Sequence, residues 1–377
     1  MAKLGEVCTI VSGSTPKTSV TSYWDGNIKW ITPAELNEDT FYIMDSVRHI
    51  TEEGKEKTGL SYLPTGTVIL SSRAPIGKTA IAGCEMCCNQ GFKNLICSDA
   101  IYNEYLYFFL KSKTDYLNSL GRGATFKEIS KSIVESIEIP LPEVNQQKEI
   151  AEKFKKLEQL ISLRKQQLAK LDELVKARFV EMFGERSSIR PQKLKEVTRR
   201  VKVGFVGTCE KYYTDNTGVP MLRTTNITSH GIDLKDLKYV TRTFHEKNLK
   251  SQVHKGDLLI ARHGSNGQAN VYCGDEAQCL NAIIIEPDHN ITNPIFLENL
   301  INSRSVKRQI EKELVGSTQH VLNTTTLANV EVKIPAIKEQ QVFAAFVERV
   351  NKQKQTVQQS LEKLELMKKA LMQDYFG

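Results

Sequence analysis

Three short stretches of the sequence contain residue types that could do chemistry. Residues 84–88 include the Cys-x-x-Cys spacing that clasps one face of a tetrahedral zinc ion, but a second close pair at ligand spacing is missing. Residues 74–79 end like a phosphate-binding loop, yet Ser72 stands where that loop requires a glycine. Residues 263–267 lack the Gly-x-Ser-x-Gly order of a nucleophile elbow. We therefore predict neither catalytic residues nor metal ligands in this chain.

The composition excludes further classes of protein. A DNA amino-methyltransferase needs an Asp/Asn-Pro-Pro-aromatic segment to hold the flipped base, and the 377 residues contain no Pro-Pro pair. No apolar run approaches the roughly 20 residues of a membrane helix, and residues 1–16 do not resemble a secretory signal. The eight cysteines are scattered along the chain, which is typical of reduced thiols. We expect a cytoplasmic protein without membrane contact.

The elements that position any functional side chains occur twice. Three stretches of the first half return in the second half at a spacing of about 190 residues: 63–81 as 253–271, 136–147 as 329–341, and 176–184 as 368–377. A repeat of this length indicates two copies of one domain plan. Within each copy, short β-branched runs bounded by Gly, Pro, Asn and Ser predict strands, and local helical patterns lie between them.

We therefore predict an α+β fold with two similar globular domains, each followed by a long helix. The predicted boundaries are 1–142 and 185–337 for the domains, and 143–184 and 338–377 for the helices. Each helix carries an apolar seam at a spacing of four and three residues, which favours pairing in an antiparallel coiled coil. The predicted packing residues are Ile150, Phe154, Leu157, Ile161, Leu168, Leu171 and Val175 in the first helix, and Val350, Val357, Leu361, Leu364 and Leu371 in the second.

The two helices share their ending as well as their period. At about 1.5 Å per residue, 40 residues make a rod of roughly 60 Å. Two unrelated amphipathic helices, each lying on its own domain, are the alternative, but the shared Phe-Gly ending favours a paired structure. We expect Phe183 and Phe376 to cap equivalent apolar ends, and Gly184 and Gly377 to end the helices where a left-handed conformation is easy.

Charge and polar variation distinguish the two copies. Residues 1–142 hold 14 Lys and Arg against 16 Asp and Glu, whereas residues 185–335 hold 21 against 16. Corresponding loop positions also differ, since Lys78 of the first copy aligns with Gln268 of the second. Arg, Asn, Gln and Lys pair with base edges in DNA grooves, and Lys, Ser and Thr reach phosphates. A shared frame with different polar loops is typical of recognition rather than catalysis.

Several motifs resemble one known family. They are residues 12–36 (SGSTPKTSVTSYWDGNIKWITPAEL), residues 71–77 (SSRAPIG), residues 139–151 (IPLPEVNQQKEIA) and the two Phe-Gly endings. In this order and repetition they resemble the specificity subunits of type I restriction-modification systems, over essentially the whole chain. The second domain departs more from the family pattern, because it lacks the Gly-Gly-Thr-Pro type opening and the Arg-Ala-Pro loop. We expect such a departure where two domains read different sequences.

The resemblance implies a function and partners. Each globular domain would dock on one half of a split double-stranded DNA target, and the antiparallel helices would set the number of unread base pairs between the halves. Two methyltransferase subunits, which carry S-adenosylmethionine and methylate adenine, would dock on the helices with pseudo-twofold symmetry. Restriction subunits that use ATP and Mg²⁺ for translocation would join them. The chain itself would need no cofactor.

On this reading, loop residues of both domains contact DNA bases or phosphates. The predicted residues of the first domain are Lys17, Thr18, Ser72, Arg73, Lys78, Arg122, Thr125 and Lys127. Those of the second domain are Arg199, Arg200, Lys202, Arg223, Asn226, Arg262, His263, Asn266, Gln268, Gln319 and His320. Two alternatives remain open: a coiled-coil interaction protein with duplicated protein- or glycan-binding domains, and an autonomous DNA methyltransferase or nuclease.

Overall fold

The computed structural model describes residues 1–37, 39–73, 75–123, 127–184, 189–228, 231–262, 267–315 and 322–377. The chain forms two units: unit 1 consists of residues 1–165 and 359–377, and unit 2 of residues 166–358. The first long helix, α6 (Val144–Phe183), begins in unit 1 and ends in unit 2. The second, α11 (Ile337–Phe376), begins in unit 2 and ends in unit 1. Each unit therefore contains the start of one long helix and the end of the other.

Unit 1 combines short strands with helices, as the alternation of β-branched runs and helical patterns predicts. Before α6 its helices are α1 (Leu4–Val7), α2 (Glu52–Thr58), α3 (Asn103–Ser112), α4 (Thr114–Leu120) and α5 (Lys131–Ser136). Its strands are β1 (Ala2–Lys3), β2 (Cys8–Ser12), β3 (Trp24–Ile31), β4 (Tyr42–Ile43), β5 (Arg48–Ile50), β6 (Val68–Ser71), β7 (Thr79–Ala82), β8 (Cys87–Cys88), β9 (Phe92–Cys97) and β10 (Glu138–Ile139).

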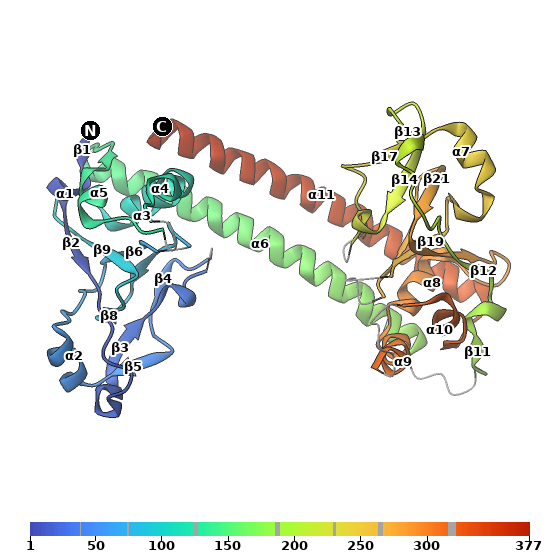
Figure 1. Cartoon of the computed structure of the whole chain (residues 1–377), viewed down its shortest axis with the longest axis horizontal. Coiled ribbons are helices and arrows are strands. Elements are labelled where there is room, and N and C mark those ends of the chain that lie inside the picture. Colours follow the sequence, from blue (N-terminus) through green and yellow to red (C-terminus); the bar gives the residue numbers. More distant parts are fainter. Residues whose placement is uncertain are drawn as a thin grey trace. The chain divides into compact units, whose positions relative to one another are not determined.

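The two main sheets of unit 1 and its helices form three layers. The first sheet has the strand order β2-β9-β6-β7-β4, and the second has the order β5-β3-β8. Successive side chains of a strand point to opposite faces, so Val68 and Leu70 of β6 pack with α3 and α6 while Ile69 packs toward the second sheet. Helix α3 lies between the first sheet and α6 (Figure 1).

Unit 2 repeats this construction with its own set of elements. Its helices are α7 (Arg242–Lys247), α8 (Pro294–Ile301), α9 (Arg304–Val315) and α10 (Thr324–Ala328), together with its parts of α6 and α11. Its strands are β11 (Gln192–Lys193), β12 (Thr198–Val203), β13 (Tyr213–Thr214), β14 (Val219–Arg223), β15 (Ile227–Thr228), β16 (Gly231–Ile232), β17 (Lys238–Val240), β18 (Gln252–His254), β19 (Leu258–Ala261), β20 (Ala269–Val271), β21 (Glu276–Leu280), β22 (Ala282–Pro287) and β23 (Glu331–Val332).

Strand pairing shows that the two units share one frame. In unit 1, β3 pairs antiparallel with β5 and parallel with β8, with Trp30 opposite Cys87. In unit 2, β14 pairs antiparallel with β17 and parallel with β21, with Met221 opposite Gln278. Met221 follows Trp30 by 191 positions in the sequence, and Gln278 follows Cys87 by the same number, so the strand register is the same in both units. Because a slip of one residue would turn every side chain to the other face, this agreement confirms two similar α+β domains.

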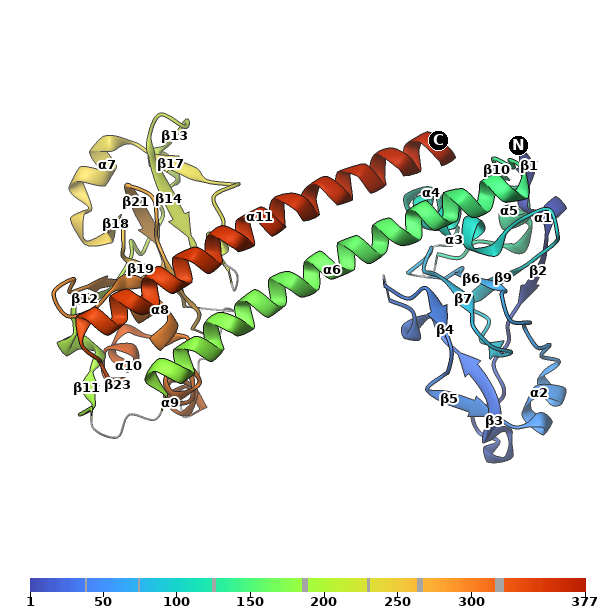
Figure 2. The same cartoon turned by 180° about the vertical axis from the view of Figure 1, so that it is seen from behind.

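In each unit the start of one long helix packs against the end of the other. In unit 1 the rings of Phe154 on α6 and Phe376 on α11 are stacked with centroids 5.6 Å apart. In unit 2 the ring of Phe343 on α11 lies 5.6 Å from that of Phe183 on α6. Figure 2 shows the start of α11 and the end of α6 together in this unit. The two segments run antiparallel within each unit, because a residue near the start of one helix meets a residue near the end of the other.

A buried glutamine fixes the start of each long helix. Gln147 of α6 accepts a hydrogen bond from the backbone N–H of Tyr102 at 2.8 Å, and its Nε2 donates to two backbone carbonyls. Gln340 of α11 makes the corresponding three bonds, beginning with the N–H of Asn293 at 2.8 Å. Both side chains are fully buried. The sequence stretches matched at residues 136–147 and 329–341 therefore have the same structural role in both units.

The ends of the two helices differ in one respect from the prediction. Gly377 adopts the left-handed conformation with a φ of 86°. Gly184 does not, and the prediction for it was wrong. The N–H of Gly184 donates to the carbonyl oxygen of Val180 at 2.7 Å, and the N–H of Gly377 donates to that of Gln373 at 3.0 Å, so the helical hydrogen bonding extends by one residue in both helices. No helix of the described chain is long and apolar enough to span a bilayer.

Candidate nucleic-acid interface

In unit 1 the end of β6 meets a short ion network. The Arg73 Nε donates to Glu128 Oε2 at 2.9 Å, and the Lys93 Nζ lies 3.2 Å from Glu128 Oε1. Burial acts to raise the pKa of Glu128, but the hydrogen bonds from Arg73 and Lys93 outweigh it and hold the pKa below its usual value. The Arg73 side chain remains 43% exposed. The ion network thus holds the Arg73 side chain at its Nε and leaves part of the guanidinium exposed.

A second loop lies against this arginine. Arg122 and Glu128 exchange both backbone hydrogen bonds, at 3.0 and 2.9 Å, which closes the loop between them. The N–H of Ile129 donates to the carbonyl oxygen of Ser72 at 2.9 Å and ties the loop to the end of β6. Arg122 and Lys127 are exposed. Three predicted basic residues therefore gather on one surface, with Glu128 as the counterion of Arg73.

Two other predicted residues of unit 1 are held by the protein itself. Ser72 is fully buried. The Lys78 Nζ donates to the carbonyl oxygens of Leu36 at 2.6 Å and Pro33 at 3.3 Å. Both positions border the same surface, but the structure uses them to brace its loops.

Lys17 and Thr18 lie on the segment that precedes β3, and both are exposed. The indole N–H of Trp24 donates to the carbonyl oxygen of Lys17 at 3.2 Å. The N–H of Ser14 donates to the carbonyl oxygen of Cys88 at 3.0 Å, which places the segment beside the loop that follows β8.

In unit 2 the end of β14 forms a tight turn with its own arginine. The Arg223 N–H donates to Asn226 Oδ1 at 3.0 Å, just as the Thr32 N–H donates to Glu35 Oε1 at 2.7 Å in the equivalent turn of unit 1. Asn226 is buried and its Nδ2 donates to the carbonyl oxygen of Asp233 at 3.1 Å. One turn geometry thus presents different side chains in the two units.

Arg262 lies beside that turn, at the end of β19. Its Nη1 donates to Asn281 Oδ1 at 3.0 Å, and its buried Nε has no hydrogen-bond partner among the described residues. Asn281 itself has a φ of 53°, an uncommon conformation for a residue other than glycine. The carbonyl oxygen of Asn281 accepts from Thr224 Oγ1 at 3.4 Å, so Asn281 joins the two arginine-bearing turns. Gln268 is half-buried just before β20.

The three basic residues of β12 lie apart from Arg262. Arg200 Nε and Lys202 Nζ are each 3.9 Å from Glu286 Oε2 on the neighbouring strand, and the Lys202 side chain is only 16% exposed. Lys202 pairs with Ile284 of β22, which in turn pairs with Leu259 of β19, and Arg262 follows Leu259 by three residues. At about 3.3 Å per residue, Arg262 lies roughly 10 Å further along the sheet. Arg199 is exposed on the same edge strand.

Five predicted DNA-contacting residues lie outside the residues that the structure describes. They are Thr125, His263, Asn266, Gln319 and His320.

Sequence reasoning missed the partners that hold the predicted arginines. Lys93 was missed because it lies inside a strand that pairs on both sides, where a polar residue carries no loop signal. Glu128 and Asn281 were missed because their role is to bind Arg73 and Arg262, which belong to elements distant in the sequence. The guanidinium of Arg48 lies 3.6 Å from the ring centroid of Trp24, a contact between two strands that no local motif could reveal.

The described residues contain no cluster of metal-ligating side chains, counted as three or more His, Cys, Asp or Glu. At the predicted Cys-x-x-Cys stretch, burial raises the pKa of Cys87 to about 11 and that of Cys88 to about 12. These two thiols are therefore protonated at neutral pH.

The residues predicted for the helix seam all lie at the least exposed positions of the long helices. Buried are Ile150, Phe154, Leu157, Ile161, Val350, Val357 and Leu361, and half-buried are Leu168, Leu171, Val175, Leu364 and Leu371. The buried seam residues of α6 extend to Ile161, and those of α11 extend to Leu361. The predicted seam residues that follow, from Leu168 in α6 and from Leu364 in α11, are half-buried.

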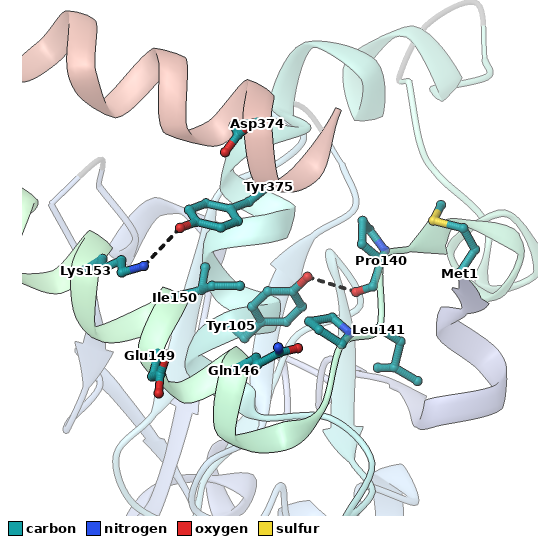
Figure 3. Close-up of a pocket in the computed structure, with 11 residues that line it drawn as sticks. Met1, Tyr105, Pro140, Leu141, Gln146, Glu149, Ile150, Lys153, Asp374 and Tyr375 are labelled. Carbon is teal, nitrogen blue, oxygen red and sulfur yellow. Dashed lines mark hydrogen bonds between the residues drawn. The ribbon is translucent and has the colours of Figure 1, made fainter.

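A cavity of about 540 Å³ lies at the junction of helix ends in unit 1 (Figure 3). The Tyr105 hydroxyl donates to the carbonyl oxygen of Pro140 at 2.9 Å on one side of it. The Lys153 Nζ donates to the Tyr375 hydroxyl at 3.1 Å on the other, which joins α6 to α11. The cavity gives this end of the helix pair a concave surface with both apolar and charged residues.

The sequence matches known proteins along most of its length. Residues 1–173 and 202–366 match the family described as type I restriction modification DNA specificity domain. A relative from Methanocaldococcus jannaschii, the type I restriction enzyme MjaIX specificity subunit, is 39% identical over 184 residues, which cover 48% of this chain and 43% of the relative. The match thus spans less than half of that relative. The MjaVIII specificity subunit of the same organism is 25% identical over 74% of this chain and 70% of its own.

Solved structures share the fold. The S subunit of a type I restriction-modification system from M. genitalium is similar with a TM-score of 0.58 at 14% identity, over 100% of this chain and 95% of its own. A structure that describes assembly and conformational transition of the type I system is similar with a TM-score of 0.61 at 16% identity, over 99% and 96%. With two matched segments that cover most of its residues, the chain belongs to the type I restriction-modification DNA specificity domain family.

Proposed function

We propose that this chain is the DNA-recognition subunit of a type I restriction-modification complex. Residues 1–142 would read one half of a bipartite target and residues 185–337 the other half. The observation that carries the proposal is that units 1 and 2 share one fold and strand register but have different polar side chains at equivalent positions. At the turn after β3 in unit 1 and after β14 in unit 2, Thr32 and Glu35 occupy the positions equivalent to Arg223 and Asn226.

Arg73 and Arg262, both half-buried, support direct readout. A guanidinium can bind the O6 and N7 acceptors of guanine with two N–H groups in the major groove. The Arg73 Nε donates to Glu128. Within the described residues its side chain makes no further hydrogen bond, so its Nη groups are available to bind a base. Arg262 is likewise held by a single described partner, Asn281. Each domain thus presents an arginine at the corresponding strand end.

The helix pair supports a role as spacer and docking surface. Each unit is closed by the start of one long helix and the end of the other, and the two buried glutamines make the same bonds. Two equivalent helix junctions suit two copies of one partner. We propose that two methyltransferase subunits dock there, and that restriction subunits join the complex.

The chemistry would then belong to the partners. We propose that this chain transfers no group and holds no cofactor. S-adenosylmethionine would be bound by the methyltransferase subunits, and ATP with Mg²⁺ by the restriction subunits. The site of action would be the cytoplasm, where the DNA target lies.

Methylation mapping tests this function. In cells that contain an active partner methyltransferase, methylated adenines are mapped genome-wide with and without this chain. We expect a split motif that disappears with the gene, whereas an unchanged methylome would refute the proposal. In vitro, the chain copurified with the methyltransferase should shift a duplex carrying that motif, and the methyltransferase alone should not. Methylation by the isolated chain with only S-adenosylmethionine added would favour an autonomous methyltransferase instead.

A further inference from the structure

Helix α9 of unit 2 carries a row of exposed cations that no predicted contact includes. Arg304, Arg308 and Lys312 recur every four residues and are all exposed. None of the three makes a hydrogen bond or ion pair with another residue that the structure describes. Side chains four residues apart lie on the same face of a helix, and eight residues extend over about 12 Å. We call these three residues the α9 ridge.

The opposite face of α9 fixes the helix beside the candidate interface. Val306 and Ile310 are buried in the core of unit 2. Ile310 also borders Gly267, where an added Cβ would lie 3.7 Å from its Cδ1. Gly267 belongs to the turn that leads into β20. Helix α9 is therefore held by the turn at Gly267, which lies between Arg262 and β20.

Two further contacts tie α9 to that segment. At the start of the helix, Asn302 makes a pair of hydrogen bonds with the backbone of Ala269, at 2.9 and 2.8 Å. Beyond its end, the N–H of Leu322 donates to the carbonyl oxygen of Arg262 at 3.2 Å. These contacts fix the start of α9 to β20 and place the chain beyond its end beside Arg262.

The fold does not require these cations. In unit 1, α4 follows α3 as α9 follows α8, and α4 contains Asp115 but no Lys or Arg. Helix α9 has four Lys or Arg and two Glu. Because the positive charge occurs on α9 of unit 2 and not on α4 of unit 1, it points to a ligand of unit 2.

We infer that the α9 ridge binds the phosphate backbone of DNA beside the half-site read by the second domain. This inference rests on the proposed function and deepens it. One strand of DNA carries a phosphate about every 3.4 Å along the axis, so a row of about 12 Å spans at least three phosphates and each of its three cations can reach one. Phosphate contacts fix position and carry no sequence information directly. The ridge would strengthen binding to every sequence and leave the target unchanged.

Salt dependence of DNA binding tests the ridge. The variant R304A/R308A/K312A, in complex with the partner methyltransferase, is titrated by fluorescence anisotropy against a duplex with the split motif and an unrelated duplex of equal length. Each phosphate contact contributes about 0.9 to the slope of log K against log salt. We expect the slope to flatten by about 2 to 3 on both duplexes, with the ratio of the two affinities unchanged. E311Q, which removes a carboxylate from the same helix, serves as the matched control and should not flatten the slope.

The possible results separate this inference from the proposed function. A flattened slope on both duplexes, with an unchanged far-UV circular dichroism melting curve, supports the ridge. An unchanged slope in the triple variant, while the wild-type complex binds normally, overturns the ridge alone. A loss confined to the motif duplex also overturns it, because the residues would then read bases. A wild-type complex that binds neither duplex overturns the proposed function as well.

Discussion

Phe154 joins the two long helices to the core of unit 1, and its replacement by alanine should destabilise that unit specifically. Its side chain is 0% exposed, and its ring is stacked on Phe108 at 5.1 Å and on Phe376 at 5.6 Å between centroids. Removal of a buried phenylalanine costs about 3 to 5 kcal/mol. Because two stacked aromatic pairs are lost as well, we expect a value near 5 kcal/mol.

Urea unfolding followed by tryptophan fluorescence measures this loss in one unit. The only two tryptophans of the chain, Trp24 and Trp30, lie in unit 1. With a urea dependence of about 3 kcal/mol per molar, the fluorescence midpoint of F154A should fall by roughly 1.5 M. F343A, which removes a fully buried phenylalanine from the helix junction of unit 2, should lower the midpoint seen by far-UV circular dichroism and affect the fluorescence less.

An exposed leucine on the other long helix, within unit 1, provides the control. Leu366 of α11 is 68% exposed, so L366A should change stability by no more than about 0.5 kcal/mol. A fluorescence midpoint for F154A within about 0.2 M of wild type would refute the reasoning. Equal fluorescence shifts for F154A and L366A would refute it as well.

Two other predictions follow from buried polar groups. Gln147→Leu and Gln340→Leu each leave three backbone groups without a partner, so each should lower the free energy of unfolding by about 3 kcal/mol or more, measured by thermal unfolding. Gln146→Leu, a control on the exposed face, should not have this effect. Equal melting temperatures for the buried and control variants would contradict the prediction. The pKa of Glu128 is lowered by its bonds to Arg73 and Lys93, so its ion pairs stabilise unit 1 above about pH 4.3 and lose this effect as the pH falls through the folded-state pKa. The difference in urea midpoint between wild type and E128Q should therefore shrink from pH 6 to about pH 3.5, and a constant difference would count against the network.

Sequence patterns predicted the parts of the fold that depend on local order. The Gly- and Pro-free seam predicted both long helices, and the repeat at about 190 residues predicted two copies of one frame. The role of Lys78 could not be predicted, because the carbonyl groups that it binds lie more than 40 positions away in the chain. Gly184 was predicted from its type alone, but its φ depends on how the chain leaves the helix.

The candidate interface was predictable only in part for the same physical reason. Arg73 and Arg262 stand at the ends of recognisable strands, so their place on a loop surface follows from the repeat. Whether a side chain is free depends on partners from other elements. Ser72 and Asn226 were plausible contacts by type, yet both are buried within their own units. Lys93 and Glu128 form the base of the Arg73 site and carry no local signal.

The central claim is that two domains read two separate halves of one target. Methylated adenines are mapped genome-wide in cells that contain the partner methyltransferase and either the wild-type chain, R73A or R262A. Loss of a guanidinium that reads a base should cost about 1 to 3 kcal/mol and relax one position. We expect R73A to relax one half of the split motif and R262A to relax only the other half. Variants that both alter the same half, or a motif without a gap, would contradict it.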